Sequence, residues 1–230
     1  MSVFVNYLQG SSSLEERIGA LRDQIGIEAE PWNKVCTFLA PLRDKGPIYH
    51  LQYEHTLRVT LLCVSVAEFM HVSQKVLFYA GLLHDIGKVQ TPAETLGKTS
   101  GWTNKDSDIM RDHVTDSYRM LKGSFNFTAE VVIWHHQFQK DSYPKVMPKP
   151  NEYLLGTKIM IPLYGRLLSL CDQYDALHRI DGHWGMGIPS GEHIKDQMLA
   201  LNPDQEKLIE GFYASEIFTT YIDLASLRLV

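Results

Sequence analysis

The sequence predicts an all-α fold, a helical bundle preceded by a small N-terminal helical segment. Between residues 50 and 70, the apolar residues Leu57, Leu61, Val64 and Phe69 recur at spacings near the helical period. No segment alternates apolar and polar residues as a half-buried strand would, and the chain has no internal repeat or heptad run. These observations favour helices packed around one core.

Length and composition are those of a globular protein with one main domain. The chain has 230 residues, of which 44% are hydrophobic and 21% charged, so it can bury a core without disulfides. Its three cysteines, Cys36, Cys63 and Cys171, are widely spaced among apolar residues. This pattern excludes a zinc finger and predicts reduced core thiols in a cytoplasmic protein.

Charge and hydropathy restrict the expected partners. A formal net charge of -5 argues against a nonspecific nucleic-acid binder, which needs a broad basic surface. The net charge does not exclude a small phosphate ester as a substrate, because metal ions can neutralise such a substrate locally. The most apolar run, residues 59–70, is short and interrupted by polar residues, so no membrane span is expected. A homodimer or a signalling partner stays open.

Residues 1–47 are expected to form an accessory helical segment, and residues 48–230 the main domain. Ser13 and Glu16 have the spacing of a capping box, which predicts a helix through about Ile27. Pro31 is expected to begin a second helix. The stretch 41–47 has the composition of a connection, with a proline at each end and a glycine before the second.

The first part of the main domain is predicted to contain four helices. They are expected over residues 50–70, 73–84, 106–121, and from Thr128 to the pair His135-His136. Gly87 is expected to end the second helix, and residues 91–101 to form an irregular connection that flanks a site.

The second part of the main domain begins with a long loop. The expected elements are a basic, proline-broken loop over 137–154, an apolar helix over 159–177, a glycine-rich loop over 182–191, and a last helix from Asn202-Pro203 through Tyr213. The basic loop directly follows the His pair, so it is expected to lie beside any site that the pair helps to form.

Side chains that bind metals recur along the predicted helices. The pair His84-Asp85 directly follows an apolar helical run, and a carboxylate beside an imidazole can bridge two cations. Alone, such a dipeptide is more often a helix cap or a surface pair. The full set of candidates is His55, His84, Asp85, His113, His135, His136 and Asp172. Seven such groups on apolar helices are costly to bury unless something satisfies them jointly, and a metal would.

The order of these residues resembles the HD superfamily of metal-dependent phosphohydrolases. It is most similar to the HD-GYP branch, which hydrolyses cyclic di-GMP and related cyclic dinucleotides. The matching stretches, which lie between residues 50 and 180, are Glu54-His-Thr-Leu-Arg-Val59, Leu82-Leu-His-Asp-Ile-Gly-Lys88, Asp112-His113, Trp134-His-His136 and Leu168-Leu-Ser-Leu-Cys-Asp-Gln-Tyr-Asp-Ala-Leu177. Each stretch alone is a weak signal, whereas five in family order are a strong one.

The resemblance implies a binuclear metal centre. One ion would be held by His55, His84, Asp85 and Asp172, and the other by Asp85, His113, His135 and His136, with Asp85 as the bridge. Imidazole and carboxylate ligands suit iron or manganese without choosing between them. The implied reaction is phosphodiester hydrolysis by a hydroxide shared between the two ions, which also stabilise charge on the phosphoryl oxygens.

Three residues are expected to contact the substrate. Lys88 stands at the family position that meets the phosphate, so we expect it to act in catalysis with Asp85; the alternative is a solvent-exposed cation at a helix end. Tyr143, in the basic loop, and Arg179, after Asp-Ala-Leu, are the other candidates, although Arg179 is out of register with the family's arginine.

The chain departs from the family pattern at two other places. Leu51 stands where members with a third metal have a glutamate, so we expect two ions, although His50 and Glu54 lie close by in sequence. The His pair is followed by Gln137 in place of glutamate, and the Gly-Tyr-Pro motif is reduced to Ser142-Tyr143-Pro144 without its glycines. Phosphodiester hydrolysis is therefore better supported by the sequence than the identity of the ester.

Three readings remain open from the sequence. The first is a cyclic dinucleotide phosphodiesterase, with a general HD-type nucleotide phosphohydrolase as its near alternative. The second is a catalytically weak HD domain that senses a nucleotide or binds a partner, which the degenerate glycine motif favours and the complete ligand set disfavours. The third is a structural helical bundle with buried histidines and no stoichiometric metal.

Overall fold

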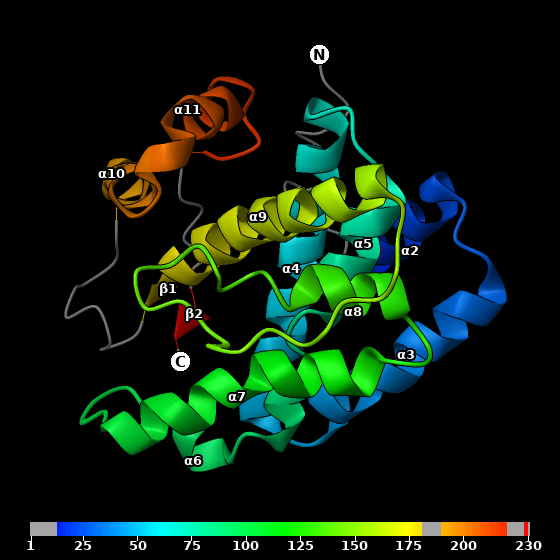
Figure 1. Ribbon diagram of the computed structural model, residues 1–230. Coiled ribbons are helices and arrows are strands. Elements are labelled where there is room, and N and C mark those ends of the chain that lie inside the picture. The colour runs from blue at the N-terminus through cyan, green and yellow to red at the C-terminus, as the bar shows by residue number, and fades with distance from the viewer. Residues whose placement is uncertain (1–12, 181–189, 220–227, 230) are drawn as a thin grey trace.

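Helices make up most of the chain that the structure describes. The structure, a computed structural model, describes residues 13–180, 190–219 and 228–229 (Figure 1). The helices are α2 (Leu14–Ile25), α3 (Ala29–Asp44), α4 (Pro47–Phe69), α5 (Gln74–Leu83), η1 (Ile86–Gln90), α6 (Ala93–Leu96), α7 (Asn104–Leu121), α8 (Asn126–Val132), α9 (Leu155–Leu177), α10 (Gly191–Leu201), η3 (Pro203–Gln205) and α11 (Glu206–Ala214). The all-α prediction is confirmed.

Two very short strands are the exception to the helical fold. β1 (Arg179–Ile180) follows α9 directly and pairs in parallel with β2 (Arg228–Leu229) near the end of the chain. These strands were not predicted, because two residues are too few to establish an alternating pattern. None of the described helices is long and apolar enough to cross a membrane.

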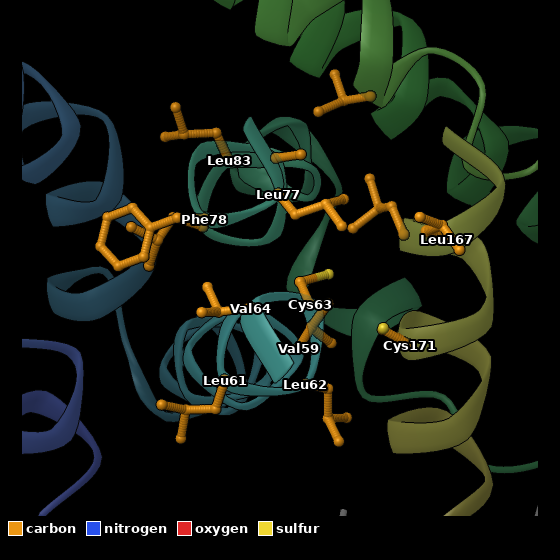
Figure 2. Close-up of a cluster of buried hydrophobic side chains, with 14 of the residues drawn as sticks. Val59, Leu61, Leu62, Cys63, Val64, Leu77, Phe78, Leu83, Leu167 and Cys171 are labelled. Atoms are coloured by element: carbon orange, nitrogen blue, oxygen red, sulfur yellow. The ribbon is translucent and has the colours of Figure 1, made fainter. Parts of the chain in front are cut away.

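Helix α4 lies at the centre of the core. All of its residues from 59 to 67 are buried, as in a helix surrounded by others. Figure 2 shows side chains of α5 above this helix and Leu167 and Cys171 of α9 beside it. Gly81 of α5 permits the close contact with α4, because a Cβ there would lie 2.7 Å from the Thr60 Cα. All three cysteines are free, and Cys63 and Cys171 are buried, as predicted. Cys36 is only partly buried, so its predicted core position is wrong.

The N-terminal helices pack on the same core. The predicted capping box is present: Glu16 N donates to Ser13 Oγ at 3.2 Å, and Ser13 N donates to the Glu16 carboxylate at 2.8 Å. Side chains of α2 and α3 belong to one apolar cluster with those of α4 and α5. The Tyr53 hydroxyl of α4 also donates to the Glu15 carboxylate of α2 at 2.7 Å. The division of the chain at residue 47 stays a prediction.

The expected connection over residues 41–47 is wrong for its first part. Helix α3 continues through Pro41 and ends at Asp44. Proline has a helical φ and costs the helix one hydrogen bond, while Val35, Leu39 and Leu42 on either side are buried along one face. This packing outweighs the local signal of Pro41.

Helix α7 lies across η1 at very short range. Its start is set by a capping box between Thr103 and Asp106, two residues before the predicted start. Gly87 of η1 lies against α7, where its N–H donates to Ser117 Oγ at 2.8 Å. A Cβ at residue 87 would lie 2.1 Å from the His113 carbonyl oxygen. The prediction that Gly87 ends the second helix is wrong, because α5 already ends at Leu83 and Gly87 lies inside η1. The glycine instead permits the close contact with α7.

Helix α8 is shorter than predicted and begins earlier. It runs from Asn126 to Val132, so Thr128 lies inside the helix and does not cap it. After Val132 the backbone forms successive turns, with Trp134 N donating to Val131 O at 3.1 Å. The predicted extension of this helix to the His pair is therefore wrong. In Figure 1, α8 lies between α7 and α9.

The described chain after α9 holds a helix, α10, that the sequence did not predict. Most of the expected loop over 182–191 lies outside the described residues, and α10 begins at its end, capped by Ser190, whose hydroxyl accepts from His193 N at 3.1 Å. The predicted last helix is confirmed as η3 followed by α11. The buried Arg166 of α9 donates to Asn202 at 3.0 Å and to Asp204 at 2.6 Å, and so fixes these helices on α9.

Candidate metal centre

Five segments of the chain bring the seven candidate ligands together. His55 comes from α4, His84 and Asp85 from the turn between α5 and η1, His113 from α7, His135 and His136 from the turns after α8, and Asp172 from α9. Six of the seven residues are buried and His136 is partly buried. Their possible ligand atoms form two groups, one of His55, His84, Asp85 and Asp172 and one of His113, His135 and His136, each within 4.8 Å.

The first group is built around two carboxylates. The His55 Nε2 lies 3.0 Å from Asp172 Oδ1 and 3.5 Å from Asp85 Oδ2. The His84 Nε2 lies 3.3 Å from the same Asp85 oxygen and 3.8 Å from Asp172 Oδ1. Two imidazoles and two carboxylates therefore point one ligand atom each toward a common centre.

Asp85 connects this group to the second one. While its Oδ2 faces His55 and His84, its Oδ1 lies 3.2 Å from His113 Nε2 and 3.9 Å from His135 Nε2. The second carboxylate, Asp172, also faces the second group, with its Oδ2 4.0 Å from His136 Nε2. A carboxylate that directs one oxygen to each of two groups has the arrangement of a bridging ligand.

The polar atoms at this centre fit a divalent cation. His84 Nε2, His113 Nε2, His135 Nε2 and Asp85 Oδ1 are buried, and none has a hydrogen-bond partner among the described residues. Asp85 Oδ2 is buried as well and forms an ion pair with Lys88. Buried polar atoms are normally satisfied, since each one left without a partner costs about 1–3 kcal/mol. Imidazole nitrogens and carboxylate oxygens are the donors that iron, manganese and zinc accept. The cluster can therefore hold a divalent metal.

Three of the imidazoles are oriented by backbone carbonyls. The Nδ1–H of His84 donates to Gly81 O at 2.8 Å, that of His135 donates to Val132 O at 2.5 Å, and that of His113 donates to the Met110 carbonyl. In each pair the carbonyl belongs to the residue three positions earlier. These hydrogen bonds leave each Nε2 with its lone pair toward the centre, as metal ligation requires.

His55 is oriented by a charged chain. Its Nδ1 lies 2.6 Å from Asp175 Oδ2, and Asp175 in turn accepts from Arg58 Nε at 2.7 Å and Nη2 at 2.9 Å. Asp175 lies one helical turn after the candidate ligand Asp172 on α9. The structure places it against the ligand imidazole.

Electrostatic interactions keep the two central carboxylates ionised. Burial raises the pKa of Asp85, but the nearby charges of His84 and Lys88 hold it well below its usual range. Burial likewise raises the pKa of Asp172, but the hydrogen bond from His55 and the nearby charge of His84 hold it well below its usual range. Both residues are therefore in the ionised form that binds metals.

The imidazoles divide into two kinds. Burial lowers the pKa of His135 to about 3 and holds that of His136 well below its usual range, so both are neutral. Burial also lowers the pKa of His84, but the negative charges of Asp85 and Asp172 outweigh it and raise the pKa to about 10. The negative potential that favours a proton at His84 favours a metal cation at the same position.

Lys88 lies at the edge of the cluster. Its Nζ forms an ion pair with Asp85 Oδ2 and donates to the Gln52 side-chain oxygen at 3.1 Å. Only 8% of the residue is exposed, so the alternative of a solvated helix-end cation is wrong. A buried ammonium beside the central carboxylate is well placed to meet an anion that approaches the centre.

Of the other two predicted substrate contacts, one lies at the centre. The Tyr143 ring stacks on His136, with centroids 4.5 Å apart, and meets His113 edge-on. The Tyr143 ring also forms a cation–π contact with the Arg111 guanidinium, whose carbon lies 5.9 Å from the ring centroid. Arg179 begins β1, and its side chain lies outside the part of the chain that the structure describes.

Sequence reasoning missed several residues that support the ligands. Arg58 lies one helical turn after His55, and a charged residue within an otherwise apolar helix was the available signal. Gln52 accepts a hydrogen bond from Lys88 that only the fold creates, since 36 positions separate the two residues. The Gln139 side-chain amide lies 2.7 Å from His136 Nδ1, in the loop whose course after the His pair was not predictable.

Comparison with known proteins identifies relatives that cover between about half and three quarters of this chain. The chain is 31% identical over 133 residues to the cyclic di-GMP phosphodiesterase of Thermotoga maritima, which covers 54% of this chain and 34% of the relative. It is 28% identical over 178 residues to the cyclic di-GMP phosphodiesterase response regulator RpfG of Xanthomonas campestris, covering 74% and 43%. The match to the 3'3'-cGAMP-specific phosphodiesterase 1 of Vibrio cholerae is 30% over 132 residues, covering 54% and 28%.

The chain spans less than half the length of each of these relatives. Their names agree with the resemblance to the HD-GYP branch. A solved structure, the HD domain of the phosphodiesterase PgpH from L. monocytogenes, is 15% identical, with a TM-score of 0.49 over 82% of this chain and 90% of that one. Residues 52–177, more than half of the chain and inclusive of all seven candidate ligands, match the HD domain, so this chain belongs to the HD domain family.

Proposed function

We propose that this chain is a metal-dependent phosphodiesterase that hydrolyses a cyclic dinucleotide. The observation that carries the proposal is Asp85, whose two carboxylate oxygens face two separate groups of imidazoles. Such a carboxylate can hold two ions close together, which is the arrangement that phosphoester hydrolysis uses to stabilise attacking and leaving oxygens.

Two divalent ions, with iron or manganese best suited, would occupy this centre. His55, His84, Asp85 and Asp172 would hold one, and Asp85, His113, His135 and His136 the other. When bound, such ions lower the pKa of water and neutralise charge that develops on phosphoryl oxygens. Mixed imidazole and carboxylate ligands accept both iron and manganese, and cellular availability decides between them.

The chain's own residues would then bind and orient the ester. Asp85 and Asp172 stay ionised at neutral pH and supply the negative charge that holds the cations. Lys88 supplies a buried positive charge beside them for the non-reacting phosphoryl oxygens. Tyr143 lies over His136 at the border of the centre and would contact a sugar or base of the substrate.

The names of the relatives favour a cyclic dinucleotide as the substrate, whereas the loop over residues 137–154 does not define which one. Three relatives are named as phosphodiesterases of cyclic di-GMP or of 3'3'-cGAMP. Residues 137–154 lack the glycines of the family's Gly-Tyr-Pro motif, so the contacts to the bases differ from those expected for that branch. This loop favours the second candidate function, a phosphohydrolase of simpler nucleotides, over a strict preference for one dinucleotide.

A combined metal and hydrolysis experiment tests the proposal. The purified full chain, loaded anaerobically with Fe²⁺ or Mn²⁺, is expected to bind two ions per chain and to release a linear dinucleotide or mononucleotides from cyclic di-GMP or cyclic GMP-AMP. Asp85→Ala is expected to abolish hydrolysis and to reduce bound metal, because both ions lose a ligand. Asp23→Asn, which changes an exposed carboxylate on α2, serves as the matched control and should change neither.

The outcomes separate the alternatives. Cleavage of mononucleotides but of no cyclic dinucleotide would assign the second candidate function. Bound metal and bound cyclic dinucleotide without turnover would assign the sensing module. A chain without stoichiometric metal would be the structural bundle, and an active, fully metallated Asp85→Ala variant would refute the bridging role.

A further inference from the structure

We propose that Arg58 and Asp175 are positioning residues that make the two metal positions unequal. The position built on His55 would bind a divalent ion more tightly and fill first. This inference rests on the metal binding proposed above and is independent of which ester is hydrolysed.

The support of His55 differs in kind from that of the other ligand imidazoles. The Nδ1 atoms of His84, His113 and His135 face neutral backbone carbonyls. His55 Nδ1 faces a carboxylate, Asp175 Oδ2, at 2.6 Å. Among the candidate ligand imidazoles, all of which lie in the described residues, this is the one with a charged acceptor at Nδ1. A carboxylate at that nitrogen raises the basicity of the opposite one and so strengthens its bond to a metal.

Asp175 is itself held by two charge-assisted hydrogen bonds. Arg58 donates through Nε to Oδ1 at 2.7 Å and through Nη2 to Oδ2 at 2.9 Å, the parallel arrangement in which guanidinium and carboxylate planes match. The side chains of Arg58 and Asp175 are 13% and 8% exposed. Because both oxygens of Asp175 are engaged and little water reaches them, the carboxylate has one orientation, and the His55 ring takes its orientation from it.

The chain of contacts also ties two helices together on one side of the centre. Arg58 follows His55 by three residues on α4, and Asp175 follows Asp172 by three residues on α9. One ligand and one support therefore come from each helix, and the pairs face each other across the helix interface. The second group takes its ligands from α7 and from the turns after α8, and their Nδ1 partners are a backbone carbonyl or the Gln139 amide. A ligand set that is already oriented loses less conformational entropy when the ion binds.

Metal titration of the full chain tests this inference without relying on catalysis. Mn²⁺ is titrated into metal-free protein by isothermal titration calorimetry, and electron paramagnetic resonance distinguishes isolated from coupled Mn²⁺ at each ratio. The wild type is expected to bind in two steps, with the first ion at least about tenfold tighter than the second. Asp175→Asn, which keeps the shape and removes the charge, should weaken the first step by about 10–100-fold and leave the second step nearly unchanged.

Two further variants keep the test interpretable. Arg58→Lys retains the positive charge but not the two parallel hydrogen bonds, and it should weaken the first step by a smaller factor than Asp175→Asn. Asp204→Asn removes the charge from another arginine–aspartate pair, in which Arg166 Nη2 of α9 lies 2.6 Å from Asp204 Oδ1 of η3, and it should leave both steps as in the wild type. If Asp175→Asn does not fold, the Arg58→Lys titration decides the question.

The results distinguish this inference from the proposed function. Two equal binding steps in the wild type, or equal weakening of both steps in Asp175→Asn or Arg58→Lys, would overturn the inequality and leave the hydrolysis experiment unaffected. Unequal steps in a chain that cleaves no cyclic dinucleotide would support the inequality and refute the proposed substrate. A chain that binds no Mn²⁺ and no Fe²⁺ would overturn both.

Discussion

Replacement of Gly87 by alanine tests how the fold holds the centre together. A Cβ at this position would lie 2.1 Å from the His113 carbonyl oxygen and 2.6 Å from Ser117 N. Ordinary van der Waals contact begins at 3.4 Å, and both neighbouring atoms belong to the backbone of α7, which cannot rotate away as a side chain can. The variant must therefore separate η1 from α7, and His113 moves with that helix.

The cost can be estimated from two effects. Overpacking of a well-packed interface costs about 1–3 kcal/mol. Separation also breaks the hydrogen bond from Gly87 N to Ser117 Oγ, 2.8 Å long, and leaves a buried donor without a partner, at about 1–3 kcal/mol. We expect a loss of about 2–6 kcal/mol in the free energy of unfolding, a large share of the roughly 5–15 kcal/mol typical of a domain. Because His113 Nε2 lies 3.2 Å from Asp85 Oδ1, bound metal should fall as well.

Urea unfolding followed by circular dichroism, together with metal analysis, measures both effects. Gly19→Ala on α2 is the control, because a Cβ there meets nothing within 4 Å. It should leave metal content unchanged and stabilise the chain by up to about 1 kcal/mol, since alanine favours the helix. If Gly87→Ala unfolds at the wild-type urea concentration and binds the full complement of metal, the proposed close packing of η1 on α7 is refuted.

Three other changes are expected to separate metal binding from substrate binding. Lys88→Met should lower kcat/KM at least about tenfold while bound metal is retained or tightened, because a cation that competes for Asp85 is removed; loss of metal on titration would contradict this. Arg111→Met should raise KM for a cyclic dinucleotide, because Arg111 lies over Tyr143 at the border of the centre. Arg119→Met is the control, since both arginines pair with an aspartate three residues earlier on α7, and it should leave KM unchanged. Equal KM values for the two variants in steady-state kinetics would count against a role for Arg111. Removal of metal by a chelator should lower the melting temperature. At a free metal concentration about 100 times Kd, a bound ion should contribute roughly 2.7 kcal/mol to the free energy of unfolding. An unchanged melting curve by differential scanning calorimetry would show that the ions do not stabilise the fold.

The local signals of the sequence located most helices. Apolar residues at the helical period predicted α4, and the capping box of Ser13 and Glu16 correctly marked the start of α2. The helix expected from residue 73 agrees with α5, which begins at Gln74. These signals are short-range, so they fail where packing opposes them. Pro41 lies inside α3 because buried neighbours hold the helix, and Thr128 lies inside α8 because the helix begins at Asn126.

The candidate ligands could be collected from the sequence because each is a residue type with metal chemistry in a family order. The sequence could not show that Asp85 directs one oxygen to each group, since that depends on side-chain orientation between helices far apart in the chain. Arg58 and Asp175 likewise acquire their role across 117 positions.

What the sequence alone determined is therefore the all-α class, the seven side chains and their order along the chain. The tertiary structure decided which of these atoms face one another, through contacts such as that of Gly87 with α7 and that of Gly81 with α4, where the absence of a side chain lets two backbones approach. The physical reason is that helix formation depends on neighbouring residues, whereas a metal centre depends on distances between segments that only packing sets.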